Sequence, residues 1–248
     1  MTSLPPARCC TLGNLHEGEA QGEIRDIGKI STYFAYPPDK SATENAILIL
    51  TDVIGHQFIN AQLLADKFAA NGYLVVMPDL FEGDTVPLNR PEGFKIMDWL
   101  QNHLPQHVEP IIDEVIKEMR EKLGVKRIGG IGYCFGGRYV CRYLKPGTGK
   151  LEVAYTAHPT MVGPDELAGI EGPLSIAAAV KDFVFTTEKR HESEEILAKL
   201  DVPYQINLFS DVDHGFAVRC DLTQRRQKAA KEAAFTQAVQ WFDLYLKE

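Results

Sequence analysis

Short apolar runs alternate with longer amphipathic segments along most of this 248-residue chain, and this alternation limits the folds that it can adopt. The apolar runs have the length of strands and cover Ala46–Leu50, Tyr73–Met77, Arg127–Gly132, Val153–Ala157, Leu174–Val180 and Tyr204–Phe209. The other segments have helical lengths and cover Phe58–Ala70, 91–123, Phe135–Leu144, Glu188–Leu200 and Thr223–Leu246. Runs such as AILIL are apolar at consecutive positions, as expected of parallel strands covered on both faces. The alternation predicts an α/β protein with a mostly parallel central sheet and helices on both faces.

The organisation of the chain is simple. No linker, charge block or internal repeat divides it, so we predict a single domain over residues 1–248. Residues 1–29 are rich in Gly, Glu and Pro and predict an irregular N-terminal arm that could include a short edge strand. Gly124 lies where a helix should end. Pro110 is placed to open the helix that runs to Leu123.

Composition excludes several classes of function. The chain has 26 Lys and Arg against 34 Asp and Glu, a net charge of −8, which offers no basic surface to nucleic acid or anionic lipid. The start, MTSLPPARCC, lacks the apolar core of a signal peptide, and the apolar runs are far shorter than a membrane span. Five cysteines in no zinc or disulfide pattern favour a reducing compartment. We therefore expect a cytoplasmic protein that binds neither nucleic acid nor membrane.

One predicted strand ends in an unusual motif. The segment 132–136 reads GYCFG, which is the G-x-S-x-G nucleophile elbow with cysteine in place of serine. A strand that turns sharply into a helix brings backbone segments together, which explains the glycines on both sides. The turn also places the sulfur at a helix N-terminus, where the helix dipole favours the thiolate. The motif predicts Cys134 as a nucleophile.

A nucleophilic thiol needs a base, and the base needs a group that orients it. In α/β-hydrolases these groups follow the nucleophile in the order acid, then histidine. His214 follows the last predicted strand and precedes a glycine, so it is the histidine that fits. Asp182 directly follows the run LSIAAAVK and fits the acid. Asp211 and Asp213 belong to the loop of the histidine itself, and we interpret them as loop-forming residues.

The other six histidines divide into two groups. His56 and His158 follow predicted strands, so both are candidates to line the site and bind substrate, although either could be a satisfied turn residue. The remaining four are predicted to lie at the surface: His16, His103, His107 and His191.

From about Ile30 to the C-terminus the chain resembles the dienelactone hydrolase family of α/β-hydrolases. The resemblance is carried by GYCFGG, by VVMPDLFEGD, by Lys181-Asp182 and by HGF. It implies an α/β-hydrolase fold and hydrolysis of small lactones or activated esters without metal or cofactor. Its site residues are the catalytic triad Cys134, Asp182 and His214 and the oxyanion donors, which are the backbone N–H groups of Val53 and Phe135.

Two positions depart from the bacterial pattern of that family. Asp52 stands where the pattern has a glutamate that contacts the resting thiol, and we predict that Asp52 controls the thiol. One of two arginines that bind a substrate carboxylate is replaced around residues 82–84, and Arg219 is the candidate for the other. These departures make the chain more similar to fungal and animal members of uncertain substrate.

Two other functions stay open. A hydrolase scaffold could bind a lactone-like ligand without turning it over, but the chain keeps all three members of the triad. A redox sensor would need a resolving thiol, and Cys141 lies seven residues after Cys134, about 10 Å along a helix and too far for a disulfide. The expected partner is a small lactone or ester substrate, with the protein acting as a monomer or homodimer.

Overall fold

A single mixed sheet forms the centre of the molecule. The computed structural model describes residues 1–40, 44–145 and 151–247, and within them eight strands form a sheet in the order β1-β2-β4-β3-β5-β6-β7-β8. The strands are β1 Glu23–Ile27, β2 Ile30–Ala35, β3 Asn45–Leu50, β4 Leu74–Pro78, β5 Arg127–Tyr133, β6 Val153–Ala157, β7 Leu174–Lys181 and β8 Tyr204–Asp213. β2 is antiparallel to β1 and to β4, and the neighbours from β4 to β8 are parallel. The predicted mostly parallel sheet is confirmed.

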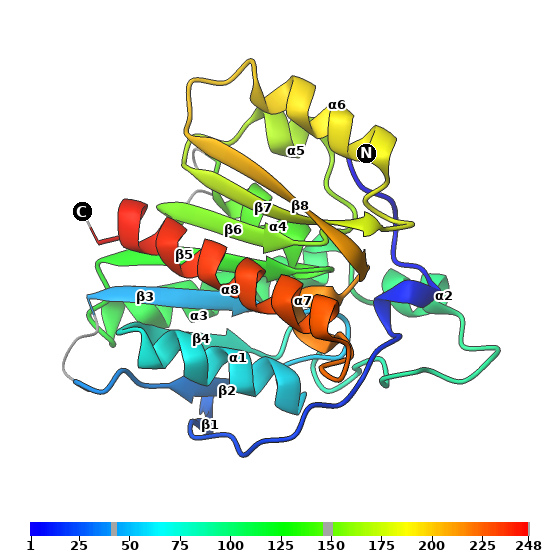
Figure 1. The fold of residues 1–248 in the computed structure, drawn as a ribbon. Helices are drawn as coiled ribbons and strands as arrows, with labels where there is room; N and C mark the ends of the chain where they lie inside the picture. Colours follow the sequence, from blue (N-terminus) through cyan, green and yellow to red (C-terminus); the bar gives the residue numbers. More distant parts are fainter. Residues whose placement is uncertain (41–43, 146–150, 248) are drawn as a thin grey trace.

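Helices cover both faces of this sheet. They are α1 Ile59–Ala70, α2 Ile96–Gln101, α3 Pro105–Glu121, α4 Gly136–Tyr143, α5 Pro164–Ala168, α6 Thr187–Leu197, α7 Phe216–Arg219 and α8 Arg225–Tyr245, with a 3-10 turn η1 at Arg8–Cys10. α1 and α8 pack on one face, and α3 and α4 pack on the other (Figure 1). β4 is therefore buried at every residue, and β3 at every residue but its first. This is the predicted α/β-hydrolase fold. None of the helices in the described ranges is long and apolar enough to cross a membrane.

The first two strands lie outside the alternation of apolar and amphipathic segments. β1 falls inside the predicted irregular arm and pairs with β2 through a tight turn in which Gly28 has a φ of +59°. Four of the five β1 residues are exposed because the strand lies at the edge of the sheet. An edge strand of this kind has little apolar patterning, so its sequence predicts it weakly.

Two predicted boundaries are wrong. The helix expected to open at Pro110 begins at Pro105, and Pro110 lies inside it. The apolar face of this helix already includes Val108, which is fully buried and precedes Pro110. Packing of this face therefore extends the helix toward its N-terminus beyond Pro110. β8 continues to Asp213 instead of ending at Phe209, through an irregular register against β7, so Asp211 and Asp213 belong to the strand.

The N-terminal arm crosses the end of the sheet at which the parallel strands terminate (Figure 1, dark blue). The Thr2 hydroxyl and amide donate to the Val162 carbonyl oxygen, and the Asn14 amide donates to that of Arg219 at 2.9 Å. In parallel sheets the chemistry is located at this edge. The arm therefore covers the place where the site is expected.

Candidate active site

The turn between β5 and α4 is a sharp strand-to-helix turn. Its central residue, Cys134, has a φ of +51°, a conformation that side-chain-bearing residues rarely adopt and that marks functional sites. A Cβ on Gly136 would lie 2.0 Å from the Leu50 carbonyl oxygen, and one on Gly132 would lie 2.5 Å from that of Gly136. Both glycines are therefore required by close backbone contacts, as the motif predicts.

Three side chains meet at the carboxyl ends of three strands. Cys134 follows β5, Asp182 follows β7 and His214 follows β8. His214 Nε2 lies 3.1 Å from Cys134 Sγ, and its Nδ1 lies 3.0 and 2.9 Å from the two carboxylate oxygens of Asp182. The arrangement has the geometry that nucleophile, base and orienting acid need.

The charges in this group favour an ion pair. Burial alone would lower the pKa of His214, but the Asp182 carboxylate and Cys10 outweigh burial and hold that pKa well above its ordinary value. Burial opposes ionisation of Asp182, but His214 and the backbone N–H groups of Val184 and Phe185 bring its pKa below the ordinary value. The carboxylate therefore stays charged and fixes the orientation of the imidazole.

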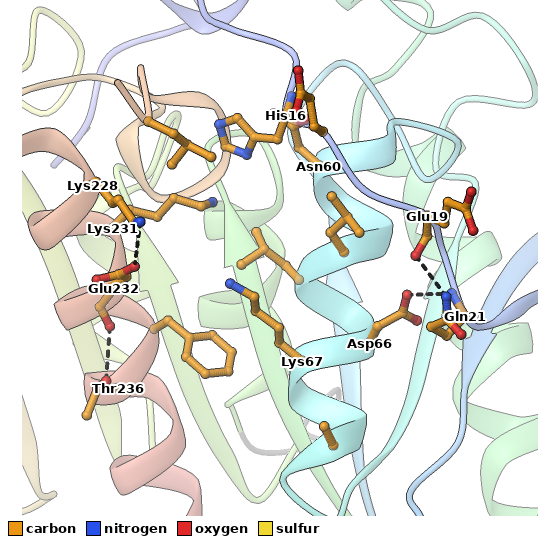
Figure 2. A pocket seen from close by; sticks show the side chains of 16 residues that line it. His16, Glu19, Gln21, Asn60, Asp66, Lys67, Lys228, Lys231, Glu232 and Thr236 are labelled. Carbon is orange, nitrogen blue, oxygen red and sulfur yellow. Dashed lines mark hydrogen bonds and ion pairs between the residues drawn. The ribbon is translucent and has the colours of Figure 1, made fainter. Parts of the chain in front are cut away.

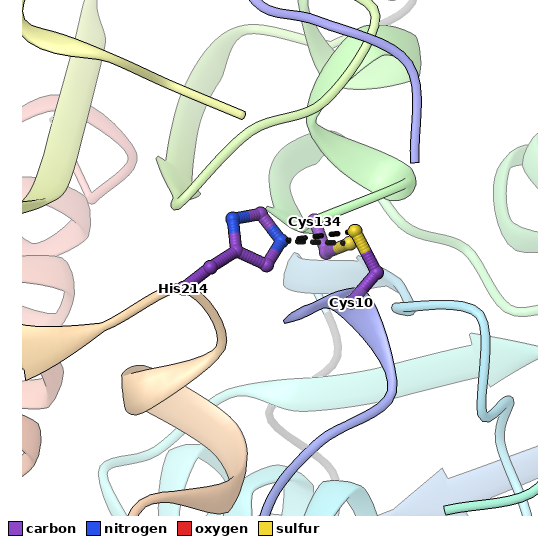
Figure 3. A group of neighbouring side chains, drawn as sticks. All are labelled: Cys10, Cys134 and His214. Atoms are coloured by element: carbon purple, nitrogen blue, oxygen red, sulfur yellow. Dashed lines mark hydrogen bonds between the residues drawn. The ribbon is translucent and has the colours of Figure 1, made fainter. Parts of the chain in front are cut away.

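A second thiol lies against the same imidazole, and the sequence interpretation did not single it out. Cys10 Sγ is 3.4 Å from His214 Nε2 and accepts a hydrogen bond from the Ala7 amide at 3.4 Å. Figure 3 shows the two sulfurs side by side, both facing His214. A hydrogen bond to Cys134, together with burial, raises the pKa of the Cys10 thiol. The residue lies in the arm, 204 positions from His214, where no motif spacing indicates a contact.

Asp52 and Arg219 form a buried ion pair with each other. The Arg219 guanidinium donates to Asp52 Oδ2, while Asp52 Oδ1 accepts from the Ile54 amide at 3.0 Å. The guanidinium also donates to the carbonyl oxygens of Leu12, at 2.9 Å, and Cys9, at 3.3 Å. Arg219 therefore holds the arm in place. It also lines a cavity that reaches His214, and its role in binding a substrate carboxylate stays a prediction. Its charge also compensates that of Asp52, which weakens the case for control of the thiol by Asp52.

The two histidines predicted to bind substrate have different surroundings. His158 is completely buried; its ring lies 5.0 Å from that of His214, edge to face, and 6.1 Å from that of Tyr133. Burial lowers its pKa well below the ordinary value, so it stays neutral beside His214. The ring of His56 is hydrogen-bonded to Ser31 at 2.9 Å and lies 3.8 Å from the carboxylate of Asp79. His158 thus lies beside His214, whereas His56 contacts Ser31 and Asp79, and a role for either in binding substrate stays a prediction.

The predicted oxyanion donors lie on two segments that are bonded together. The amide of Gly136 donates to the carbonyl oxygen of Thr51 at 3.1 Å, which ties the start of α4 to the loop after β3. The N–H groups of Val53 and Phe135 belong to these two segments and, within the described residues, neither has a hydrogen-bond partner. Both are therefore free to donate to a developing negative charge.

Two of the four histidines predicted at the surface are buried instead. The ring of His16 reaches the Cys220 carbonyl oxygen at 2.9 Å, and that of His103 reaches the Asp84 carboxylate at 3.0 Å. Both are satisfied by partners distant in the sequence, which local polarity does not reveal. His107 and His191 are exposed, as predicted.

Two cavities flank this part of the molecule. One of about 290 Å³ reaches His214 and is lined on its other sides by residues that include Phe183, Phe216 and Cys9. A larger one of about 680 Å³ lies between α1 and α8, with His16 and Lys231 among its lining residues (Figure 2). His214 lines the smaller cavity and not the larger one, and Cys134 lines neither of the two.

Comparison with known proteins agrees with this geometry. The sequence model of the Dienelactone hydrolase family matches residues 30–246. "Hydrolase pyvD" of Aspergillus violaceofuscus is 62% identical, and "Hydrolase tropI" of Talaromyces stipitatus is 52% identical, over all of both chains in each case. The solved structure of a protein described as a putative dienelactone hydrolase, from Klebsiella pneumoniae, superposes with a TM-score of 0.75 at 18% identity, covering 92% of this chain and 100% of its own. The predicted resemblance and its fungal character are confirmed.

Proposed function

Because the chain belongs to the dienelactone hydrolase family, we propose that it hydrolyses small lactones or activated esters with Cys134 as nucleophile. The observation that carries the proposal is the position of one imidazole between a thiol and a carboxylate. His214 Nε2 lies 3.1 Å from Cys134 Sγ, and Nδ1 lies 2.9 Å from Asp182. The complete triad favours turnover over binding without chemistry.

The chemistry follows from these contacts in two halves. His214 holds the proton of Cys134 on Nε2, and the thiolate attacks the carbonyl carbon of the substrate. The negative oxygen accepts hydrogen bonds from the N–H groups of Val53 and Phe135. As the ester carbon–oxygen bond breaks, His214 gives this proton to the leaving alkoxide. A thioester between Cys134 and the acyl group of the substrate forms.

The second half reverses these roles. Water gives a proton to His214 Nε2 and attacks the thioester carbonyl carbon, and the same N–H groups hold the oxyanion. The carbon–sulfur bond then breaks, the sulfur recovers the proton from His214, and the carboxylic acid leaves. Asp182 holds the imidazole throughout and stabilises its charged form.

The volume of the cavity and the burial of the thiols limit the size of the substrate and its access to Cys134. The cavity beside His214 measures about 290 Å³, which suits a small molecule. Cys134 and Cys10 are both completely buried, so we propose that the η1 turn of the arm moves aside to admit the substrate to the sulfur. No side chain that lines this cavity selects one particular lactone or ester, so we propose only the substrate class of small lactones and activated esters.

The proposal also covers the domain organisation, the subunit requirement and the cellular location of the protein. Strands between residues 23 and 213 share one sheet, which supports a single domain over residues 1–248. All triad residues come from one chain, so catalysis requires no second subunit. The five cysteines are free in the structure, which supports a reducing, cytoplasmic location.

The direct test is turnover of 4-nitrophenyl acetate and a panel of lactones by the purified protein. Cys134→Ala should lower kcat by more than about a hundredfold, as loss of a triad nucleophile does elsewhere. Cys141→Ala is the matched control, because this thiol is also buried but lies seven residues further along the chain, in α4. If Cys134→Ala kept more than about a hundredth of the wild-type kcat, Cys134 would not be the nucleophile. Absence of turnover on the whole panel would favour a protein that binds without hydrolysis.

A further inference from the structure

We propose that Cys10, Cys134 and His214 form a binding site for a thiophilic divalent metal ion such as Zn²⁺, and that the bound ion blocks the catalytic thiol. The three potential ligand atoms, two sulfurs and Nε2, all lie within 4.8 Å of one another (Figure 3). Thiolate and imidazole are the ligands that Zn²⁺ and related ions prefer. The triad explains two of these residues, but it leaves the second buried thiol without a role.

The distances already approach those of a metal site. With bonds of about 2.3 Å to sulfur and about 2.1 Å to nitrogen, tetrahedral coordination separates sulfur from nitrogen by about 3.6 Å. The two sulfur-to-Nε2 distances are 3.1 Å for Cys134 and 3.4 Å for Cys10. Shifts of a few tenths of an ångström would therefore make room for the ion. Three protein ligands leave a fourth position for water.

The surroundings of His214 match those of a metal-binding histidine. Ligating imidazoles usually donate their second ring N–H to a carboxylate, which fixes the tautomer with the other nitrogen free for the metal. Asp182 takes this part, 2.9 Å from Nδ1, and its Oδ1 is itself fixed by the amides of Val184 and Phe185. The contacts that orient the base for catalysis thus also prepare it for the metal.

The buried charges remain balanced when the ion binds. Asp182 and Asp52 carry one negative charge each and Arg219 carries one positive charge, so these three groups sum to −1. Binding of M²⁺ releases two protons in either starting state. In a neutral Cys134–His214 pair they leave from the two thiols, and in an ionic pair they leave from the Cys10 thiol and the His214 imidazolium. The charge of the buried group is therefore the same before and after binding, and burial imposes no new uncompensated charge.

An occupied site has neither nucleophile nor base. The thiolate of Cys134 is bound to the ion, and Nε2 of His214 no longer accepts a proton. The metal takes no part in the hydrolysis and only prevents it. This consequence rests on the proposed function, whereas the binding itself rests on the geometry.

The test is a titration of the fully reduced, metal-free protein with Cd²⁺, followed by the ultraviolet absorbance of the thiolate–cadmium bond. The wild type should bind one Cd²⁺ per chain with this absorbance, and Cys141→Ala should match it. Cys10→Ser removes a ligand at nearly constant shape and should weaken binding by more than about a hundredfold. This exceeds the 10- to 100-fold loss that is typical when only an outer-shell partner is removed.

A second measurement keeps the proposal testable if Cys10→Ser does not fold. Bound Cd²⁺ should protect Cys10 and Cys134 together from iodoacetamide in the wild type, as read by mass spectrometry. Absence of the absorbance, protection of only one of the two thiols, or Cd²⁺ affinity unchanged in Cys10→Ser would overturn the site. If Cd²⁺ binds as expected but the metal-free enzyme hydrolyses no ester, the proposed function fails and the metal site stands.

Discussion

Replacing Asp182 with asparagine removes the negative charge of the side chain and keeps its shape. Oδ1 of Asp182 accepts from the amides of Val184 and Phe185 at 2.8 and 2.9 Å, and an asparagine oxygen can keep both contacts. The side-chain amide nitrogen then takes the position of Oδ2, 2.9 Å from His214 Nδ1. That nitrogen is the nearer of the two atoms to Nδ1 and it donates, so it favours Nδ1 as an acceptor and the single ring proton on Nε2. An imidazole protonated at Nε2 cannot take the proton of Cys134.

The size of the loss follows from the chemistry of sulfur. In a serine triad the equivalent substitution lowers kcat about 10⁴-fold through the wrong tautomer. A thiol is far more acidic than a serine hydroxyl, so part of the thiolate forms without help from the base. We therefore expect Asp182→Asn to lower kcat between about 10²-fold and 10⁴-fold.

Stability should change with pH in a direction set by the same contact. The pKa of His214 is raised in the folded protein, so its contribution to the free energy of unfolding is fully present below the unfolded pKa, about 6.5. That contribution is lost as pH rises through the raised folded pKa. Asp182→Asn removes the partner, so the variant should be destabilised more at pH 6 than above the folded pKa of His214.

Steady-state hydrolysis of 4-nitrophenyl acetate and urea unfolding at several pH values measure both effects. Asp211→Asn is the matched control, since Asp211 is exposed, pairs with Arg226 and has a φ of +62° that asparagine tolerates well. Asp211→Asn should keep wild-type kcat. A folded Asp182→Asn variant with kcat within threefold of wild type would refute the assignment of Asp182 as the orienting acid.

Three further predictions concern the frame around the site. Gly136→Ala places a Cβ 2.0 Å from the Leu50 carbonyl oxygen and should lower the free energy of unfolding by about 3 kcal/mol or more, measured by urea unfolding. Arg219→Met leaves the Asp52 carboxylate buried without its partner and should cost about 3–5 kcal/mol, with faster proteolysis of the arm; equal proteolysis rates would contradict its anchoring role. Burial lowers the pKa of Lys231 to about 7, so its contribution to stability should rise by roughly 3 kcal/mol from pH 7 to 10; Lys231→Met should remove this rise in urea unfolding.

Much of the fold and part of the site could be predicted from local patterns. Continuous apolar runs predict buried parallel strands because such strands are covered on both faces, and the six predicted strands are all present. The elbow could be predicted because its constraints are local: Gly132 and Gly136 lie within two residues of Cys134, and both are needed by the same tight turn. Chain order then selected Asp182 and His214, because the topology of parallel strands brings successive strand ends to one edge.

What the amino-acid sequence by itself determined is therefore the sheet, the elbow and the chain order of the three residues proposed as a triad, since each depends on neighbouring residues or on the order of the strands. Only the tertiary structure decided the surroundings of that site. Cys10 meets His214 across 204 residues, and Arg219 pairs with Asp52 across 167. Neither contact has a periodic or spacing signal, because each joins segments that are far apart in the sequence and that only the packing of the whole molecule brings together.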